Sequence, residues 1–256
     1  MSAGVRRTVP ATAVAPATLY GRLVERRALD CATRHAMFHL LASHFVGVDD
    51  ATFERDLREK TAVILLEDGD GGLRGFSTLL VYTTAAAGRP ATIVYSGDTI
   101  VERGWWGNPA LASTWLDAVG RLTPYGKADV YWLLLTSGFR TYRFLPVFYR
   151  SFYPRFDEAT PPATQALLDS IASEQFGPRY DRRAGIVRFA RPQVLRGNLL
   201  DVPDGRRLDP HIRFFLERNP GFSAGDELVC VTRVHDDNLT AAARRLARRL
   251  EAQRCR

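Results

Sequence analysis

The sequence predicts an α+β fold, a mixed and mainly antiparallel twisted sheet with helices on both faces. The 256 residues are 46% hydrophobic and 25% charged, which is the balance of a globular protein with one core. Apolar residues follow helical spacing in some segments and β-type runs in others, in the order helix, helix, strand, strand, strand, helix, strand, helix. The run 129–136 is apolar on both faces, as expected of a strand in the middle of a sheet. Strands and helices intermixed in this way indicate the α+β class.

Turn and cap residues separate the predicted elements. Asp49 and Asp50 suit a helix start, the Gly/Asp turn at 68–72 joins two strands into a hairpin, and Asn108-Pro109 suits the start of another helix. Pro146 predicts a kink or a late start in the helix that contains it. The predicted elements are helices at 28–46 and 50–58, strands at 62–67, 73–84 and 92–101, a helix at 108–121, a strand at 129–136, helices at 141–153 and 161–176, strands at 185–190 and 227–234, and a helix at 239–251.

The charge of the chain indicates an anionic partner. The net charge is +7, and all but two of the 35 basic residues are arginines, which stay charged at any physiological pH. Phosphate-bearing cofactors, an acidic carrier protein and anionic lipid headgroups all fit. Nucleic acid is a poor candidate, because basic and aromatic residues are not interleaved on a recognisable nucleic-acid-binding fold.

Cysteine usage and hydropathy bear on the compartment. Cys31, Cys230 and Cys255 are widely spaced and form no C-x-x-C pair, which favours a reducing compartment over a disulfide framework or zinc ribbon. No segment approaches the roughly 18 uninterrupted apolar residues of a membrane-spanning helix. We therefore expect a cytoplasmic protein, with peripheral contact at the inner membrane face as an alternative.

The stretch 96–110 (SGDTIVERGWWGNPA) combines a strand, a basic glycine-containing loop and a helix start. Free amides and the positive dipole end of a helix attract phosphate, and glycines let the backbone approach it closely. A pyrophosphate cradle is therefore predicted, and its residues are Arg103, Gly104, Gly107, Asn108 and Ala110. The alternative is a tight strand-to-helix turn whose tryptophans fill the core.

The order of elements resembles the GNAT superfamily of N-acyltransferases over about 28–153, with 227–234 as a candidate last strand. The family loop runs Gln/Arg-x-x-Gly-x-Gly/Ala, whereas here Arg103 is followed by Gly107 and Ala110, with Asn108-Pro109 between them. The neighbourhood of Asp98, Glu102 and Arg103 also resembles N-acyl amino acid synthases and acyl-homoserine-lactone synthases, relatives that take acyl chains from acyl carrier protein.

Under this resemblance the chain divides into three parts. Residues 1–27 are expected to be a loose tail, and 28–236 the GNAT-like acyltransferase domain with an insertion at about 161–224. Residues 237–256 are expected to form a basic C-terminal helix. Its arginine face suits a membrane surface, RNA or a carrier protein, or else is simply solvated.

The resemblance implies an acid for the leaving thiolate. The segment 144–153 (FLPVFYRSFY) is similar to a family helix with a Phe-Tyr pair, and Tyr149 is the matching position. A phenol, with a pKa near 10, can protonate sulfur when it lies within hydrogen-bond reach. The alternative is that Tyr149 belongs to an aromatic core stripe.

A general base must take the proton of the attacking amine. Asp98 is the first candidate, because it lies among apolar neighbours that would raise its pKa, and Glu102 is the second. A turn-capping or ion-paired Asp98 is an equal alternative.

No metal site is predicted. His35 and His39 share a helical face, but Ala36 occupies the place of the Glu in H-E-x-x-H.

The resemblance therefore implies an acyltransferase that moves an acyl group by direct transfer from a pantetheine thioester to an amine. The donor would be acyl-CoA or acyl carrier protein, bound as a substrate rather than as a permanent cofactor. The acceptor would be a small-molecule or lipid amine. The rival hypothesis is a non-catalytic GNAT-like module that binds an acylated carrier, a lipid surface or a protein partner, and the atypical loop after Arg103 favours it.

Overall fold

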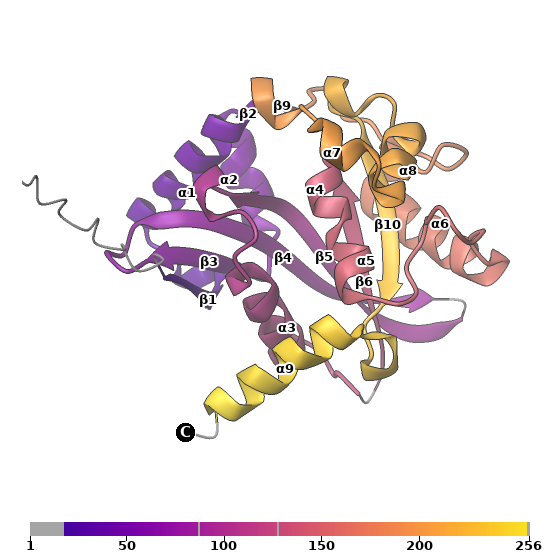
Figure 1. Cartoon of the computed structure of the whole chain (residues 1–256), viewed down its shortest axis with the longest axis horizontal. Coiled ribbons are helices and arrows are strands. Elements are labelled where there is room, and N and C mark those ends of the chain that lie inside the picture. Colours follow the sequence, from indigo (N-terminus) through magenta and orange to yellow (C-terminus); the bar gives the residue numbers. More distant parts are fainter. Residues whose placement is uncertain (1–17, 87, 127, 255–256) are drawn as a thin grey trace, which may run out of the picture.

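A computed structural model describes residues 18–86, 88–126 and 128–254 (Figure 1). Its main sheet has eight strands in the order β1-β3-β4-β5-β6-β10-β8-β7, and the short strands β2 and β9 pair separately. Of the main-sheet neighbours, β5 and β6 are parallel and the others are antiparallel. The strands are β1 (Leu19–Glu25), β2 (Phe45–Val46), β3 (Ala62–Asp68), β4 (Leu73–Ala86), β5 (Arg89–Val101), β6 (Asp129–Thr136), β7 (Tyr180–Asp181), β8 (Ile186–Val187), β9 (Val194–Leu195) and β10 (Glu227–Arg233).

Helices cover both faces of this sheet, so the predicted α+β class is confirmed. One face carries α3, α5, α8 and α9, and the opposite face carries α1 and α2 at one end and α6 at the other. The α-helices are α1 (Cys31–His44), α2 (Asp50–Arg58), α3 (Ala110–Leu122), α4 (Phe139–Tyr142), α5 (Phe144–Phe148), α6 (Pro162–Phe176), α7 (Asp204–Arg207), α8 (Pro210–Arg218) and α9 (Ala241–Arg254). The 3₁₀ turns η2 (Arg103–Trp105) and η3 (Gly177–Arg179) matter for the site.

The strand sequences explain how the two faces are filled. Successive strand residues point to opposite faces, so a strand apolar at every position builds two cores. In β6, Trp132 and Leu134 pack on the α3 face, while Leu133 and Leu135 pack on the α6 face. The central strands are therefore fixed from both sides.

The parallel pair β5–β6 comes apart before its strands end. Pairing runs from Ala91 opposite Asp129 to Ser96 opposite Leu134, although β5 continues to Val101. At the same level β5 shifts register against β4, because Ser77 pairs with Thr99 while Leu79 pairs with Ser96. Two residues of β5 thus stand opposite one of β4, which is a β-bulge that bends the strand and re-aims its side chains. A gap opens here in the middle of the sheet.

The prediction of a loose tail over 1–27 is wrong for its last part. Residues 19–25 form β1, which pairs antiparallel with β3 along its whole length. The apolar β3 presents an edge that an alternating strand can cover, and Leu19 is buried there. Residues 1–17 lie outside the described residues.

The predicted helix at 141–153 is also wrong in extent. The chain forms two short helices, α4 and α5, and Tyr149 is already extended with φ −124° and ψ 143°. Tyr149 and Tyr153 instead bridge to Leu239 and Val231. Pro146 weakens a continuous helix here, and pairing with the β10 region satisfies the backbone that follows.

The segment 161–224, predicted to be an insertion, is integral to the domain. Its strands β7 and β8 extend the main sheet beyond β10, and β9 pairs with β2. The predicted strand at 185–190 is reduced to β8.

The C-terminal helix is α9, which is shorter than the predicted 237–256, and residues 255–256 lie outside the described part.

Candidate functional site

Two cavities meet at the gap between β5 and β6. The α3-side cavity, about 600 Å³, lies between the start of α3 and the α4–α5 segment. The α2-side cavity, about 510 Å³, lies between α2, the end of β6 and the loop after β8. The two cavities share four lining residues, Phe45, Thr99, Ser137 and Thr141. The two cavities are therefore neighbours at the point where the strands part.

Arginines from separate segments line the α3-side cavity. Arg140 lies over the rings of Trp106 at 4.4 Å and Phe139 at 4.5 Å, and donates to the backbone oxygens of Leu199 at 2.7 Å and Asp201 at 3.2 Å. Burial, with the nearby guanidinium of Arg103 second, lowers the pKa of Arg140. Within the described part of the chain Arg140 has no carboxylate at ion-pair distance. Its charge is thus held in place and left to be neutralised by an anion.

Arg206 and Arg143 add to this positive wall. No ion pair of Arg206 occurs among the described residues, whereas Arg143 pairs with Asp209 at 3.1 Å. Because like charges repel unless a counter-ion is present, arginines gathered at one cavity favour a polyanionic ligand.

The start of α3 supplies backbone donors to the same cavity. The helix begins at Ala110, and Asn108 accepts the Ala110 N–H on its side-chain Oδ1 at 2.9 Å. Across residues 18–254 as described, no hydrogen bond uses the N–H groups of Leu111 and Ala112, both of which line the cavity. Free amides at a helix start bind phosphate oxygens well.

The predicted phosphate residues divide into two sets. Gly107 and Asn108 line the α3-side cavity, and Gly107 has φ +87°, a conformation that glycine adopts readily. Arg103, Gly104 and Ala110 are not in its wall. Arg103 is exposed, with its guanidinium 5.7 Å from the Trp106 ring at the rim.

The α2-side cavity is lined by three carboxylates, Asp56 of α2 and the pair Asp98 and Glu227. Asp98 lies in the β5 bulge, where burial raises its pKa and the ammonium of Lys60 opposes that rise. Glu227 begins β10, and burial together with the charge of Asp98 raises its pKa to about 8. A carboxyl group with a pKa near neutrality can gain and lose a proton at physiological pH.

The bulge itself is shaped by close packing. A Cβ on Gly97 would lie 2.7 Å from Thr78 Oγ1 and 3.2 Å from Lys60 Cε, so a larger residue would force these side chains to shift. Lys60 crosses the bulge at this point, with its Nζ 5.1 Å from the centre of the Tyr95 ring. Gly97 therefore allows the lysine to lie beside Asp98.

Glu102 is separated from Asp98 in the structure. Its carboxylate pairs with Arg74 at 3.3 Å, and Arg74 also holds Asp68 at 2.6 Å. Glu102 lines neither cavity. The two candidate bases thus have different surroundings: Asp98 faces a cavity, and Glu102 belongs to a partly exposed ion-pair group.

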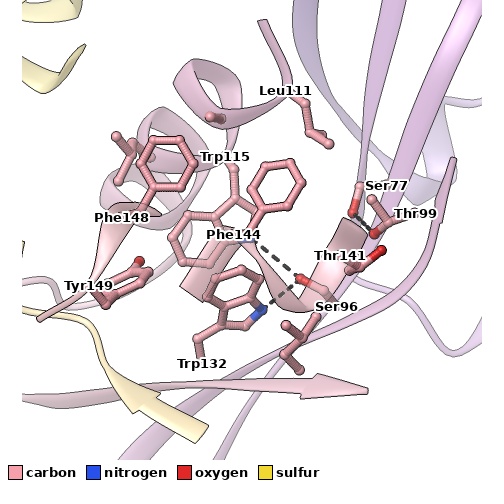
Figure 2. Close-up of a pocket in the computed structure, with 13 residues that line it drawn as sticks. Ser77, Ser96, Thr99, Leu111, Trp115, Trp132, Thr141, Phe144, Phe148 and Tyr149 are labelled. Atoms are coloured by element: carbon pink, nitrogen blue, oxygen red, sulfur yellow. Dashed lines mark hydrogen bonds between the residues drawn. The ribbon is translucent and has the colours of Figure 1, made fainter. Parts of the chain in front are cut away.

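Tyr149 lies in a third space, a small apolar cavity of about 30 Å³ shown in Figure 2. The indole N–H groups of Trp115 and Trp132 both point to Ser96 Oγ, at 3.4 and 2.9 Å. The Tyr149 ring is buried and its hydroxyl has no hydrogen-bond partner in the described chain; burial raises its pKa. Six residues are common to this cavity and the α3-side cavity, namely Thr99, Leu111, Ala112, Thr141, Phe144 and Phe148. The small cavity is thus an inner branch of the larger one.

Sequence reasoning missed Glu227, Lys60 and Arg140. Arg140 had a usable signal, since it follows the Ser137-Gly138 break after a buried strand, where loop residues reach the sheet edge. Glu227 also begins a predicted strand after a glycine. Nothing local distinguishes Lys60 from a solvated lysine.

Comparison with known proteins found no matching family model and no matching curated protein. Solved structures that match include a GNAT family N-acetyltransferase (YhbS) from Escherichia coli in complex with CoA, with 18% identity over 52% of this chain and 67% of that one and a TM-score of 0.34. A probable N-acyltransferase from Enterococcus faecalis matches 85% of this chain and 66% of its own, at 10% identity and a TM-score of 0.40. A GCN5-related N-acetyltransferase from Kribbella flavida matches 53% of this chain and 34% of its own, at 14% identity and a TM-score of 0.39. Matches at this level assign no activity to this chain.

Proposed function

We propose that this protein transfers an acyl group from a pantetheine thioester to an amine, with donor and acceptor meeting between β5 and β6. One observation carries the proposal: two cavities from different sides of the sheet join at four shared residues. The first has a wall of arginines and free helix amides, and the second has three carboxylates of raised pKa, Asp56, Asp98 and Glu227. Direct transfer needs this arrangement, because the amine must reach the thioester carbon without a covalent enzyme intermediate.

The donor phosphates would bind in the α3-side cavity. Arg140 and Arg206 would neutralise them, and the amides of Leu111 and Ala112 would donate to their oxygens. The pantetheine arm would then run toward Thr99. Both CoA and acyl carrier protein offer this arm, and the exposed Arg103 and Trp106 beside the cavity suit either one.

The acceptor amine would bind in the α2-side cavity as an ammonium and lose its proton to the Asp98–Glu227 pair. The neutral amine attacks the thioester carbon, the C–N bond forms and the C–S bond breaks. The nitrogen releases its second proton as the thiolate gains one from Tyr149, so that the products are an amide and a thiol, and the released proton restores the tyrosine. The edge of β5 beyond Ser96, which β6 leaves unpaired, is suited to polarise the carbonyl oxygen.

Tyr149 is the proposed proton donor to the leaving thiolate. Its hydroxyl is buried without a partner, and its raised pKa keeps it protonated. Protonation by Tyr149 requires the sulfur to lie at the opening of the small inner branch, where Phe148 and Thr141 are shared with the α3-side cavity.

The first experiment measures thermal stabilisation by CoA, acetyl-CoA, a long-chain acyl-CoA and acyl carrier protein, because a ligand that prefers the folded state raises the melting temperature. Arg140→Gln is expected to weaken donor binding about ten- to a hundredfold, since a hydrogen bond to a charged group contributes about 1.5–3 kcal/mol. Arg121→Gln, on the far end of α3, is the matched control. No stabilisation by any donor would contradict the proposal.

A second arm separates the enzyme from the rival binding module. Donors that stabilise the protein are incubated with a panel of amines, and acylated products are measured by mass spectrometry. Donor binding without any acylated amine would favour a non-catalytic module for an acylated carrier.

A further inference from the structure

The α2-side cavity has two ends of different character. Asp98 and Glu227 mark its inner end. Asp98 is next to Thr99, which lines both cavities, and Glu227 is next to Leu228, which pairs with Thr136 at the end of β6. This end faces the gap between β5 and β6. A reacting amine must therefore lie at this end.

The rest of the cavity wall carries basic side chains from three separate elements. They are Arg55 of α2, Arg179 of η3 and Arg191 of the loop after β8. All three are exposed. Together with Lys60 they make four basic groups in the wall, against the three carboxylates of Asp56, Asp98 and Glu227.

These arginines are weakly engaged within the protein. Arg191 has no hydrogen bond or ion pair inside the described ranges. Arg179 donates to the Phe176 backbone oxygen at 3.0 Å and lies 5.3 Å from the Phe189 ring, and no carboxylate among the described residues lies at ion-pair distance from it. Arg55 approaches Asp56 only to 3.8 Å. Guanidinium groups with so few contacts to carboxylates are suited to bind an anion from solution.

We infer that the acceptor is an amine that also carries an anionic group, a carboxylate or a phosphate, bound with its ammonium at Asp98 and Glu227 and its anion at Arg179 and Arg191. The inference rests on the proposed acyl transfer and names the class of acceptor. Electrostatic complementarity at both ends of one cavity selects a zwitterion over a simple amine, because a simple amine leaves the arginines unpaired. A polyamine is disfavoured for the same reason, since its second ammonium would face these guanidiniums.

The test compares acceptors that differ only in the anion. An α-amino acid is set against its carboxamide, and phosphoethanolamine against ethanolamine, with the donor that stabilises the protein most. The anionic member of at least one pair is expected to have a kcat/KM at least tenfold higher. The carboxylate and phosphate pairs show which anion is preferred. Equal kcat/KM values within both pairs would overturn the inference while leaving acyl transfer intact.

Variants link the preference to the named residues. In Arg191→Gln and Arg179→Gln, the ratio of kcat/KM for the anionic acceptor to kcat/KM for its neutral counterpart is expected to fall close to one within the preferred pair. The main cause is a higher KM for the anionic member. Arg183→Gln, an exposed arginine of the same region that lines neither cavity, is the matched control and keeps the ratio. A ratio unaffected by either cavity variant would also overturn the inference.

Binding without donor separates this inference from the proposed function. Calorimetry with the same pairs is expected to detect the anionic member alone, with weaker binding to Arg191→Gln. If no amine is ever acylated but this anion-dependent binding persists, the function fails and the anionic-ligand site stands. If neither binding nor acylation depends on the anion, the site itself is refuted.

Discussion

The two cavities use charge in opposite ways. In the α3-side cavity Arg140 is held by aromatic rings and backbone oxygens, with no carboxylate of the described residues at ion-pair distance. In the α2-side cavity two carboxylates sit close enough for the charge of one to raise the pKa of the other. A wall of one sign holds an anion, whereas a coupled acidic pair handles a proton. Under the proposed function, the donor phosphates bind on one side of the gap, and the proton moves on the other side, where the acceptor binds.

The largest expected effect separates these two roles. Glu227→Gln is expected to lower kcat about 10²- to 10³-fold, the usual contribution of a general base, and to leave the donor dissociation constant unchanged. Single-turnover rates at saturating donor measure the loss of rate, and calorimetry measures the donor dissociation constant. Glu217→Gln, an exposed glutamate on α8, is the control. A loss of donor affinity equal to the loss of rate would show that the two sides are not separate.

The raised pKa of Glu227 also predicts how the stability of the protein depends on pH. The folded pKa of Glu227, about 8, lies above its ordinary value of 4.5, so the folded state binds more protons between these limits. Its contribution to stability is present below about pH 4.5 and declines by up to about 1.4 kcal/mol per pH unit as the pH rises toward 8.

Denaturant unfolding from pH 4.5 to 8 measures this effect as the difference between the wild type and Glu227→Gln. The difference also cancels His211, whose pKa is lowered by burial and which acts in the opposite direction. Because Asp98 and Glu227 are coupled, the midpoint belongs to the pair. Parallel curves for the two proteins would mean that Glu227 is not desolvated.

A smaller effect concerns the inner branch of the α3-side cavity. Tyr149→Phe is expected to lower turnover about 10²-fold, at the weak end of acid catalysis, and to change donor binding little. It should also stabilise the unliganded protein by about 1 kcal/mol, because it removes a buried hydroxyl that has no partner. Rate and melting temperature together check this prediction. An unchanged rate with increased stability would make Tyr149 a core residue only.

The smallest effect is expected at Glu102. Glu102 pairs with Arg74, whose side chain is more than a third exposed, so water screens the ion pair. Glu102→Gln should therefore lower the free energy of unfolding by less than about 0.5 kcal/mol. Turnover should remain that of the wild type, because Glu102 lines neither cavity. A rate loss as large as that of Asp98→Asn would restore Glu102 as a candidate base.

Much of the architecture could be predicted because its signals are local. The cap at Asp49, the Asn108-Pro109 pair and the turn after Asp68 are short-range patterns, and the structure has a helix start or a hairpin near each. The helix after Asn108 begins one residue later than predicted, with Pro109 at its N-cap. The helix predicted at 141–153 failed for a long-range reason, since its second half pairs with residues near 231 and 239. β1 was missed because short alternating strands leave a weak signal beside a tail rich in alanine and proline.

Taken alone, the sequence determined the fold class, the positive charge and the strand-loop-helix at 96–110, because periodicity, composition and capping are properties of neighbouring residues. Only the tertiary structure decided which residues share a site. Asp98 and Glu227 are 129 positions apart and meet because β5 and β10 flank the same central strand, β6. Their raised pKa values, and the unpaired charge of Arg140, depend on burial and on partners from other segments. These are long-range quantities that a local pattern does not contain.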